Sequence, residues 1–239
     1  MERVLIINMQ SNFGAFIKPQ SNNNPETYAI IPKSALVGMM CANVGHDRDL
    51  MKSEHMYSVM TNELEYSLIL NTPFKKASWS EYSYNHLNVD NARPNYTPGR
   101  SERLYDVNYT VYIKYNTNSS EVVTSTITNF IDNVKSGVSM YPMCMGMSNM
   151  PCDVAFVDDF ALDEIKIGEF ITCGVCTNII SSNDQEYDVI GTDMLPTKSL
   201  DFLTMDKSSV KRIYFHENCG KLISSGEHYV IGSKCIEFI

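Results

Sequence analysis

The chain has 239 residues, enough for one large domain or for a domain with a small appendage. Hydrophobic residues make up 44% and charged residues 20%, which excludes a disordered or a fibrous chain. The net charge of -9 argues against a nucleic-acid partner, because neutralising phosphates takes Lys and Arg. The charge is unevenly placed, however. Residues 1–118 hold 11 Lys+Arg against 11 Asp+Glu, whereas residues 119–239 hold 8 against 17, so the first half is neutral.

The sequence predicts a cytoplasmic protein. Its first apolar run, residues 4–7, is shorter than the core of a signal peptide. No stretch of about 18 apolar residues exists that would span a membrane. The seven cysteines are odd in number and scattered, which is typical of reduced thiols in a cytosolic core.

The beginning of the chain predicts a strand, a loop and a helix. Residues 3–10 form an apolar run with β-branched side chains, which predicts a strand. The polar stretch 10–25 contains turn-forming residues and predicts a loop. Residues 35–45 predict a helix that Ser34 caps and Gly45 ends. This helix is apolar nearly all round, so we expect it to be buried between other elements.

The next elements complete a recognisable order. We expect a more polar helix over 49–61, strands over 65–70 and 106–113, a helix capped by Ser119 or Ser120 and ended by Gly137, and a strand near 153–157. The resulting order is strand, helix, strand, strand, helix, strand. This is the split βαβ pattern of a ferredoxin-like (RRM-like) domain, an α+β fold, which we assign to residues 1–160.

The helical pattern disappears at about residue 160. Short β-prone pieces then alternate with expected turns at 181–184, 218–220 and 224–226. We therefore assign residues 161–239 to a small β-rich C-terminal extension.

Residues 74–115 combine aromatic and basic side chains. They hold nine of the chain's 25 aromatic residues and six Lys or Arg against four Asp or Glu. Aromatic faces stack on unpaired bases, and Lys and Arg hold the phosphates between them, so this composition favours an arm that binds single-stranded RNA. The alternative is a long insertion whose tyrosines pack on the sheet. Tyr109 and Tyr112 lie within a predicted strand, and we assign both to packing.

Several short motifs resemble those of a known family. The run FIKP at 16–19 and the run TYAIIPKSALVG at 27–38 resemble the N-terminal signature of the CRISPR-associated "Cas five" subunit of type I Cascade complexes. The run RLYDVNY at 103–109 is similar to the strand that follows the protruding thumb of that family. The run YPMCMGMS at 141–148 is similar to its Pro-x-x-Leu-Gly-x-Ser turn, with Met145 in place of Leu. The pieces occur in the right order over residues 1–160.

The resemblance implies a non-catalytic RNA-binding subunit of a type I CRISPR Cascade surveillance complex. Members of the family bind the 5′ handle of the CRISPR RNA (crRNA) and cap one end of the Cascade backbone. They also help to position the large subunit for target DNA recognition in antiviral defence. The implied partners are the crRNA handle, the backbone subunit and the large subunit, with target DNA reached indirectly; no membrane and no cofactor is implied. Residues 75–103 would form a long protruding β-hairpin, the thumb.

The resemblance also implies which residues contact RNA. They are Phe16, Lys18, Tyr28 and Lys33 near the first loop, Arg93, Arg100 and Arg103 in the thumb, and Gly146, Ser148 and Asn149 in the later turn. The lysines lie where positive charge and helix N–H groups favour phosphate, and the aromatic rings are suited to stacking on a base. Glycine allows close approach of RNA because it has no Cβ. The structural alternatives are solvated lysines and a Tyr28 ring in the core.

An alternative function within the same family is cleavage of the precursor crRNA. One branch, type I-C, performs metal-independent cleavage with a Tyr, a Lys and a His that transfer protons at a ribose 2′-OH. The five histidines of this chain are His46, His55, His86, His216 and His228. None directly follows a lysine, as the catalytic His of that branch does. We therefore expect no endonuclease activity.

Two further clusters leave alternatives open. Cys173, Cys176, His216 and Cys219 have a spacing that suits a zinc site, although the run around the first two also suits a buried strand. Met143, Met145, Met147 and Met150 suit either a contact with a neighbouring subunit or core filling.

Overall fold

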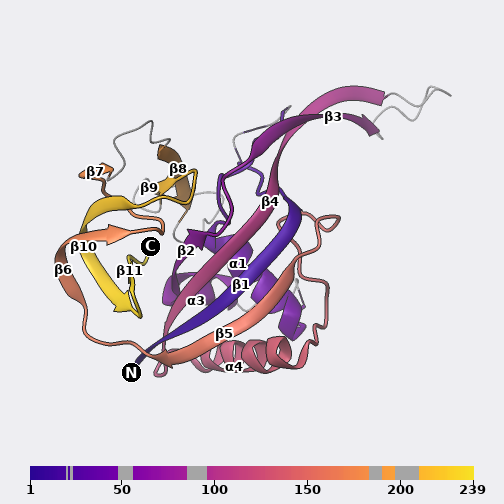
Figure 1. Ribbon diagram of the computed structural model, residues 1–239. Coiled ribbons are helices and arrows are strands. Elements are labelled where there is room, and N and C mark those ends of the chain that lie inside the picture. The colour runs from indigo at the N-terminus through magenta and orange to yellow at the C-terminus, as the bar shows by residue number, and fades with distance from the viewer. Residues whose placement is uncertain (20, 22–23, 48–55, 85–95, 183–189, 197–209) are drawn as a thin grey trace.

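The computed structural model describes residues 1–19, 21, 24–47, 56–84, 96–182, 190–196 and 210–239 (Figure 1). The helices are α1 (Lys33–Val44), α3 (Met56–Glu63) and α4 (Glu121–Ser136). The strands of the first part are β1 (Glu2–Gly14), β2 (Glu65–Leu70), β3 (Lys76–Tyr84), β4 (Tyr96–Asn116) and β5 (Asp153–Ala161). Those of the second part are β6 (Lys166–Thr172), β7 (Ser181–Ser182), β8 (Ile190–Pro196), β9 (Val210–His216), β10 (Leu222–Ile231) and β11 (Lys234–Ile236).

The first sheet has the ferredoxin-like topology that the sequence predicts. Its strand order is β2-β4-β1-β5, and every neighbouring pair is antiparallel. The helices cover one face of this sheet (Figure 1). The prediction of an α+β fold is therefore confirmed. Within the described residues, no helix combines the length and the apolar character needed to cross a membrane.

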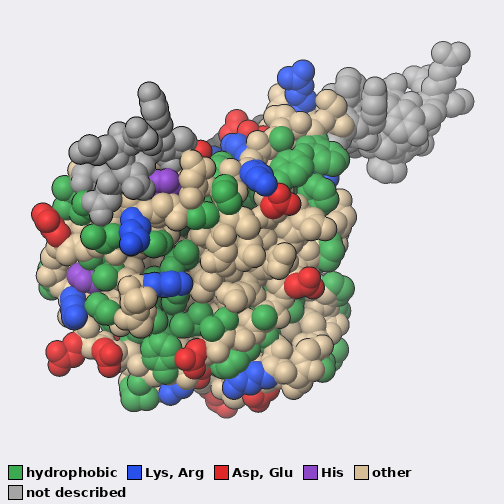
Figure 2. Space-filling view, viewed as in Figure 1, with side chains coloured by type: hydrophobic (Ala, Val, Ile, Leu, Met, Phe, Trp, Pro, Cys, Tyr) green, Lys and Arg blue, Asp and Glu red, His purple; other side chains and the backbone are tan. Residues whose placement is uncertain are grey.

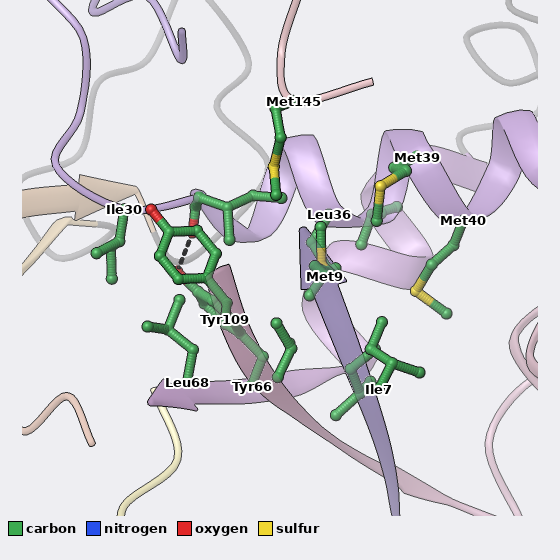
Figure 3. Close-up of a cluster of buried hydrophobic side chains, with 14 of the residues drawn as sticks. Ile7, Met9, Ile30, Leu36, Met39, Met40, Tyr66, Leu68, Tyr109 and Met145 are labelled. Carbon is green, nitrogen blue, oxygen red and sulfur yellow. Dashed lines mark hydrogen bonds between the residues drawn. The ribbon is translucent and has the colours of Figure 1, made fainter. Parts of the chain in front are cut away.

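The main core lies between the first sheet and α1 (Figure 3). Alternate residues of β1, such as Ile7 and Met9, meet Leu36 and Met40 of the helix there. Two tyrosine hydroxyls in this core need partners because they are buried. The hydroxyl of Tyr66 donates to the carbonyl of Ile31 at 2.7 Å and that of Tyr109 to the carbonyl of Ala29 at 3.5 Å, and burial raises the pKa of both tyrosines. These bonds fix the chain before α1 on the sheet.

The C-terminal ends of the helices agree with the predictions better than their N-terminal caps do. Gly45 and Gly137 both adopt the left-handed conformation that ends a helix, with φ of 92° and 67°. Ser120 is the residue before α4, as predicted. The prediction for Ser34 is wrong, because α1 begins at Lys33 and its cap position is Pro32. Proline suits the start of a helix, where the lost N–H has no helical partner.

The β3–β4 hairpin projects from the body of the molecule (Figure 1). Its strands pair from Lys76 opposite Leu104 to Tyr84 opposite Tyr96. β1 runs on to Gly14 because it pairs with β4 as far as Leu104, so the prediction of a loop from residue 10 is wrong for its first part. Pairing with a neighbouring strand, which depends on tertiary contacts, therefore extends β1 and β4 beyond the apolar segments from which they were predicted.

The described part of the C-terminal extension consists of strands, as predicted. One sheet has the order β11-β10-β6 with β7 beside β10, and β8 pairs with β9. The prediction of a turn at 224–226 is wrong, because β10 continues through these residues and Gly226 lies opposite Gly168 of β6. Apolar residues of β10 and β11 pack on the face of the first sheet that the helices leave open, together with Val4, Ile6 and Tyr112.

Candidate nucleic-acid interface

The aromatic residues of the first loop are buried. Phe16 and Tyr28 belong to the main core. The N–H of Tyr28 donates to the carbonyl of Phe16 at 2.8 Å, and the N–H of Phe16 donates to the Thr27 hydroxyl at 2.8 Å. Both predicted stacking residues therefore have the structural role that the sequence analysis left open for Tyr28.

Lys18 is paired with a carboxylate from the C-terminal extension. Its Nζ lies 3.0 Å from Oδ1 of Asp193 and 5.5 Å from the ring centroid of Tyr28. Asp193 lies in β8 and is only 8% exposed, and its Oδ2 accepts the N–H of Ala29 at 2.7 Å. Burial, together with the Asp193 charge, raises the pKa of Tyr28. Asp193 could not be identified from the sequence, since no local pattern links it to a loop more than 160 residues away.

Lys33 is buried, whereas the predicted residues of the later turn are exposed and the turn itself packs against the first loop. The Lys33 side chain is only 5% exposed at the start of α1. Gly146, Ser148 and Asn149 are exposed. The turn lies against the first loop, where Ala15 donates its N–H to the carbonyl of Met145 at 3.0 Å. Gly146 has a φ of +89°, and a Cβ there would overlap the Ala15 carbonyl oxygen. Packing within the chain therefore requires glycine at position 146.

The methionines around this turn mainly fill the core. Met145 and Met150 are buried in the main core, and Met143 and Met147 pack against it from partly buried positions. The alternative of core filling is therefore the one that the structure favours.

Four side chains gather at the base of the hairpin, and we call them the hairpin-base cluster: Phe13, Trp79, Arg103 and Tyr105. The Trp79 ring stacks near Tyr105 at 6.0 Å between centroids, and Phe13 meets both rings edge-on at 5.8 and 5.5 Å. The Arg103 guanidinium lies 4.8 Å from the centroid of Trp79. Trp79 is 37% and Phe13 36% exposed, so these rings are accessible to a ligand. Phe13 was missed because the sequence placed it in a loop.

An irregularity in the backbone of β4 determines on which face of the sheet this cluster lies. Leu104 and Val107 both pack in the main core, although residues three apart in a regular strand face opposite ways. Asp106, between them, has a φ of 48° and absorbs the change. Tyr105 and Asn108 consequently both point to the face opposite the helices. Figure 2 shows hydrophobic side chains, with Lys and Arg beside them, gathered where the hairpin leaves this face.

The predicted basic residues of the hairpin differ in their surroundings. Arg100 is exposed on β4, Arg103 belongs to the hairpin-base cluster, and Arg93 lies outside the described residues. Lys75 pairs with Asp106 at 2.7 Å and Lys76 with Glu102 at 3.1 Å. The structure therefore brings Arg103, but not the first-loop residues, into an exposed aromatic surface.

The described histidines have contacts within the protein. Nε2 of His46 lies 2.9 Å from the Thr126 hydroxyl, and His228 stacks on Phe170 at 4.3 Å. His216 is buried, and its Nδ1 accepts the N–H of Asn218 at 3.1 Å. His55 and His86 lie outside the described residues.

The cysteines occur as free thiols, and burial raises the pKa values of Cys41, Cys152 and Cys176 to about 12. In the part of the chain that the structure describes, no three His, Cys, Asp or Glu side chains converge in a way that would hold a metal ion. Cys173, Cys176, His216 and Cys219, for which the sequence left a zinc site and a buried strand open as alternatives, do not converge as such a group.

Comparison with known proteins bears on the fold. No protein-family model matches the chain, and no curated protein sequence does. A CRISPR protein from Archaeoglobus fulgidus has a similar structure, with a TM-score of 0.57 and 11% identity over 98% of this chain and 97% of that one. A chain of a CRISPR RNA-guided surveillance complex has a TM-score of 0.50 and 13% identity over 94% of this chain and 91% of that one. The chain thus shares, over nearly its whole length, the fold of these two CRISPR proteins.

Proposed function

We propose that this protein is a non-catalytic RNA-binding subunit of a type I CRISPR Cascade complex and that it binds the 5′ handle of the crRNA. The observation that carries the proposal is the exposed hairpin-base cluster, on a fold shared with a chain of a CRISPR RNA-guided surveillance complex. The motifs that resemble the "Cas five" family support the choice of subunit. The backbone and large subunits of Cascade are its proposed protein partners.

The cluster has the chemistry that single-stranded RNA requires. Exposed rings offer faces on which bases stack, and a guanidinium beside them contacts the neighbouring phosphate. Arg100 lies three residues before Arg103 on the same strand and therefore on the opposite face of the hairpin, where it adds positive charge to the hairpin as a whole. RNA would therefore run from the open face of the sheet along the hairpin, and the first loop, whose aromatic residues Phe16 and Tyr28 are buried, would support this path without stacking on the bases.

The uneven charge agrees with this path. The hairpin belongs to the neutral first half of the chain, whereas residues 119–239 carry the whole excess of nine negative charges. Since RNA repels negative charge, the proposed path avoids this acidic second half of the chain, and the extension within it then faces solvent or a basic partner. A non-catalytic role is supported by the described histidines, whose contacts lie within the fold.

Binding of a CRISPR repeat RNA to the full chain tests this function. We expect the triple variant Arg93→Ala, Arg100→Ala and Arg103→Ala to bind more weakly and to lower the slope of log K against log salt by about 2, at about 0.7 for each lost phosphate contact. A matched triple variant in the extension, Lys166→Ala, Lys221→Ala and Lys234→Ala, removes the same charge from exposed positions and keeps the slope.

Cleavage is tested in the same samples with EDTA present. The proposal expects intact RNA after incubation. Specific cut ends at the 5′ edge of the handle would instead support the alternative of a metal-independent endonuclease, and equal binding by both triple variants would remove the hairpin from the interface.

A further inference from the structure

A second group of polar side chains lies on the open face of the first sheet. Asn8 of β1, Asn71 after β2, and Asn108 and Thr110 of β4 meet there, and we call them the carboxamide cluster. Nδ2 of Asn71 donates to Oδ1 of Asn108 at 2.8 Å and to the Thr110 hydroxyl at 3.0 Å. The Thr110 hydroxyl donates to Oδ1 of Asn8 at 3.0 Å. Side chains from β1, from β4 and from the residue that follows β2 thus hold one another in fixed orientations.

The cluster keeps unused hydrogen-bond donors. Each carboxamide has two N–H donors, and those of Asn8 and Asn108 reach no acceptor among the described residues. Asn8 and Asn71 are exposed, and Asn108 and Thr110 are half-buried. The C-terminal extension covers Val4, Ile6 and Tyr112 on the same face but leaves this part of the sheet uncovered. Figure 2 shows a broad area over β1 and β4 where neither charged nor hydrophobic side chains dominate.

The cluster continues the surface of the hairpin-base cluster. Asn108 lies opposite Gln10 in the same ladder in which Tyr105 lies opposite Phe13. Because of the irregularity at Asp106, Tyr105 and Asn108 share the open face. Three residues of a strand separate them, a distance of about 10 Å. Lys75 and Asp106, the ion pair beside them, present one charge of each sign.

Resting on the proposed function, we propose that the carboxamide cluster binds the base of one unpaired nucleotide of the RNA held by the hairpin-base cluster. Uncharged donors in fixed positions suit the carbonyl and ring-nitrogen acceptors of a base edge, and Asn is among the side chains that pair with base edges. A phosphate or a cation would require charge that the cluster lacks. The hairpin-base cluster would then supply stacking and phosphate contacts, and the carboxamide cluster would distinguish bases.

The test uses the full chain, a labelled CRISPR repeat RNA and the double variant Asn71→Ala and Asn108→Ala. We expect the double variant to bind about tenfold more weakly, with an unchanged salt slope because no charged contact is lost. The matched control is Asn62→Ala, which removes an exposed carboxamide from α3 on the helical side. Equal melting temperatures of all variants establish that the fold is retained.

A series of RNAs, each with one abasic nucleotide, locates the base. The proposal expects one abasic position that weakens binding to the native protein but has no further effect on the double variant, since both changes remove the same contact. Equal RNA binding by the double variant, with a loss in Trp79→Ala, would overturn this inference and leave the proposed function intact. Loss of binding to a partner subunit with RNA binding unchanged would reassign the cluster to a protein contact and also overturn it. Absence of RNA binding by the native chain would overturn the proposed function itself.

Discussion

The first loop and the base of the hairpin each pair a cation with an aromatic ring, Lys18 with Tyr28 at 5.5 Å and Arg103 with Trp79 at 4.8 Å. Their surroundings differ. Tyr28 is buried and Lys18 is neutralised by Asp193, whereas Trp79 is 37% exposed. The first loop therefore joins the ferredoxin-like domain to its extension, and the hairpin base has a surface free to bind. The same residue types are packed in one place and partly exposed in the other, because β8 brings Asp193 onto the first loop whereas the Trp79 ring stays 37% exposed.

The largest expected effect is in the turn that supports the first loop. Gly146→Ala should lower the free energy of unfolding by about 4 kcal/mol, because the residue has a left-handed φ and its Cβ would overlap a backbone oxygen. Gly137→Ala is the matched control, with a φ of +67° but open space, and should cost about 1 kcal/mol. Urea unfolding measures both. Equal losses would mean that the contact with Ala15 is unimportant.

The next effect concerns the joint itself. Asp193→Ala should lower the free energy of unfolding by about 2–3 kcal/mol, since it leaves Lys18 and the N–H of Ala29 without their acceptor. The partial exposure of Lys18 keeps this loss below that of a fully buried pair. Asp163→Ala, at an exposed position of the extension, should change stability little. If Asp193→Ala had the same free energy of unfolding as the native protein, the first loop would not depend on this pairing and would not differ from the hairpin base in this respect.

At the hairpin base the expected change is in binding instead of stability. Trp79→Ala should weaken binding of a CRISPR repeat RNA about tenfold, because one stacking surface is lost. Its melting temperature should change little, since the ring is partly exposed. Trp79→Phe should retain most of the affinity, and Tyr141→Ala, an exposed aromatic residue outside the cluster, should retain all of it. A stability loss without a binding loss would give the hairpin base the same role as the first loop.

The smallest effect is a pH dependence in the extension. Burial raises the pKa of Glu237 above its ordinary value of 4.5, although bonds from Thr177 oppose the shift. The folded state therefore holds this proton more tightly than the unfolded state, and stability falls as the pH rises from about 4.5 through the raised pKa. Glu237→Gln should remove this fall and match the native protein below pH 4.5. Unfolding curves across the pH range measure the difference, and parallel curves for both proteins would contradict it.

Much of the fold could be predicted from local patterns. β2 has the predicted bounds, and Gly45 and Gly137 end their helices, because periodicity and left-handed glycines are local properties. Apart from the cap of α1, these errors in element bounds occur where pairing with another strand sets the end of an element. β1 continues to Gly14 through its pairing with β4, and β10 passes through the predicted turn at 224–226 because β6 pairs with it.

The candidate site was predicted in composition but not in arrangement. The composition of segment 74–115 predicts an arm that binds single-stranded RNA, and the structure brings Trp79, Arg103 and Tyr105 of this segment together, while RNA binding stays a prediction. The pairing of Lys18 in the first loop with Asp193 could not be predicted, and neither could the contact between the rings of Phe13 and Trp79. Such pairings join residues far apart in the chain, so no single-sequence pattern reveals them.

Local patterns were sufficient to predict the order of strands and helices, the β-rich extension and the concentration of aromatic and basic residues before residue 118. These follow from periodicity, turn residues and composition, which are properties of neighbours along the chain. Which rings are exposed depends instead on contacts between residues that are far apart in the chain. Side chains of similar chemistry differ in exposure because different strands lie next to them. β8 brings Asp193 to Lys18, whereas the irregularity of β4 at Asp106 leaves the partly exposed Trp79 ring on the open face.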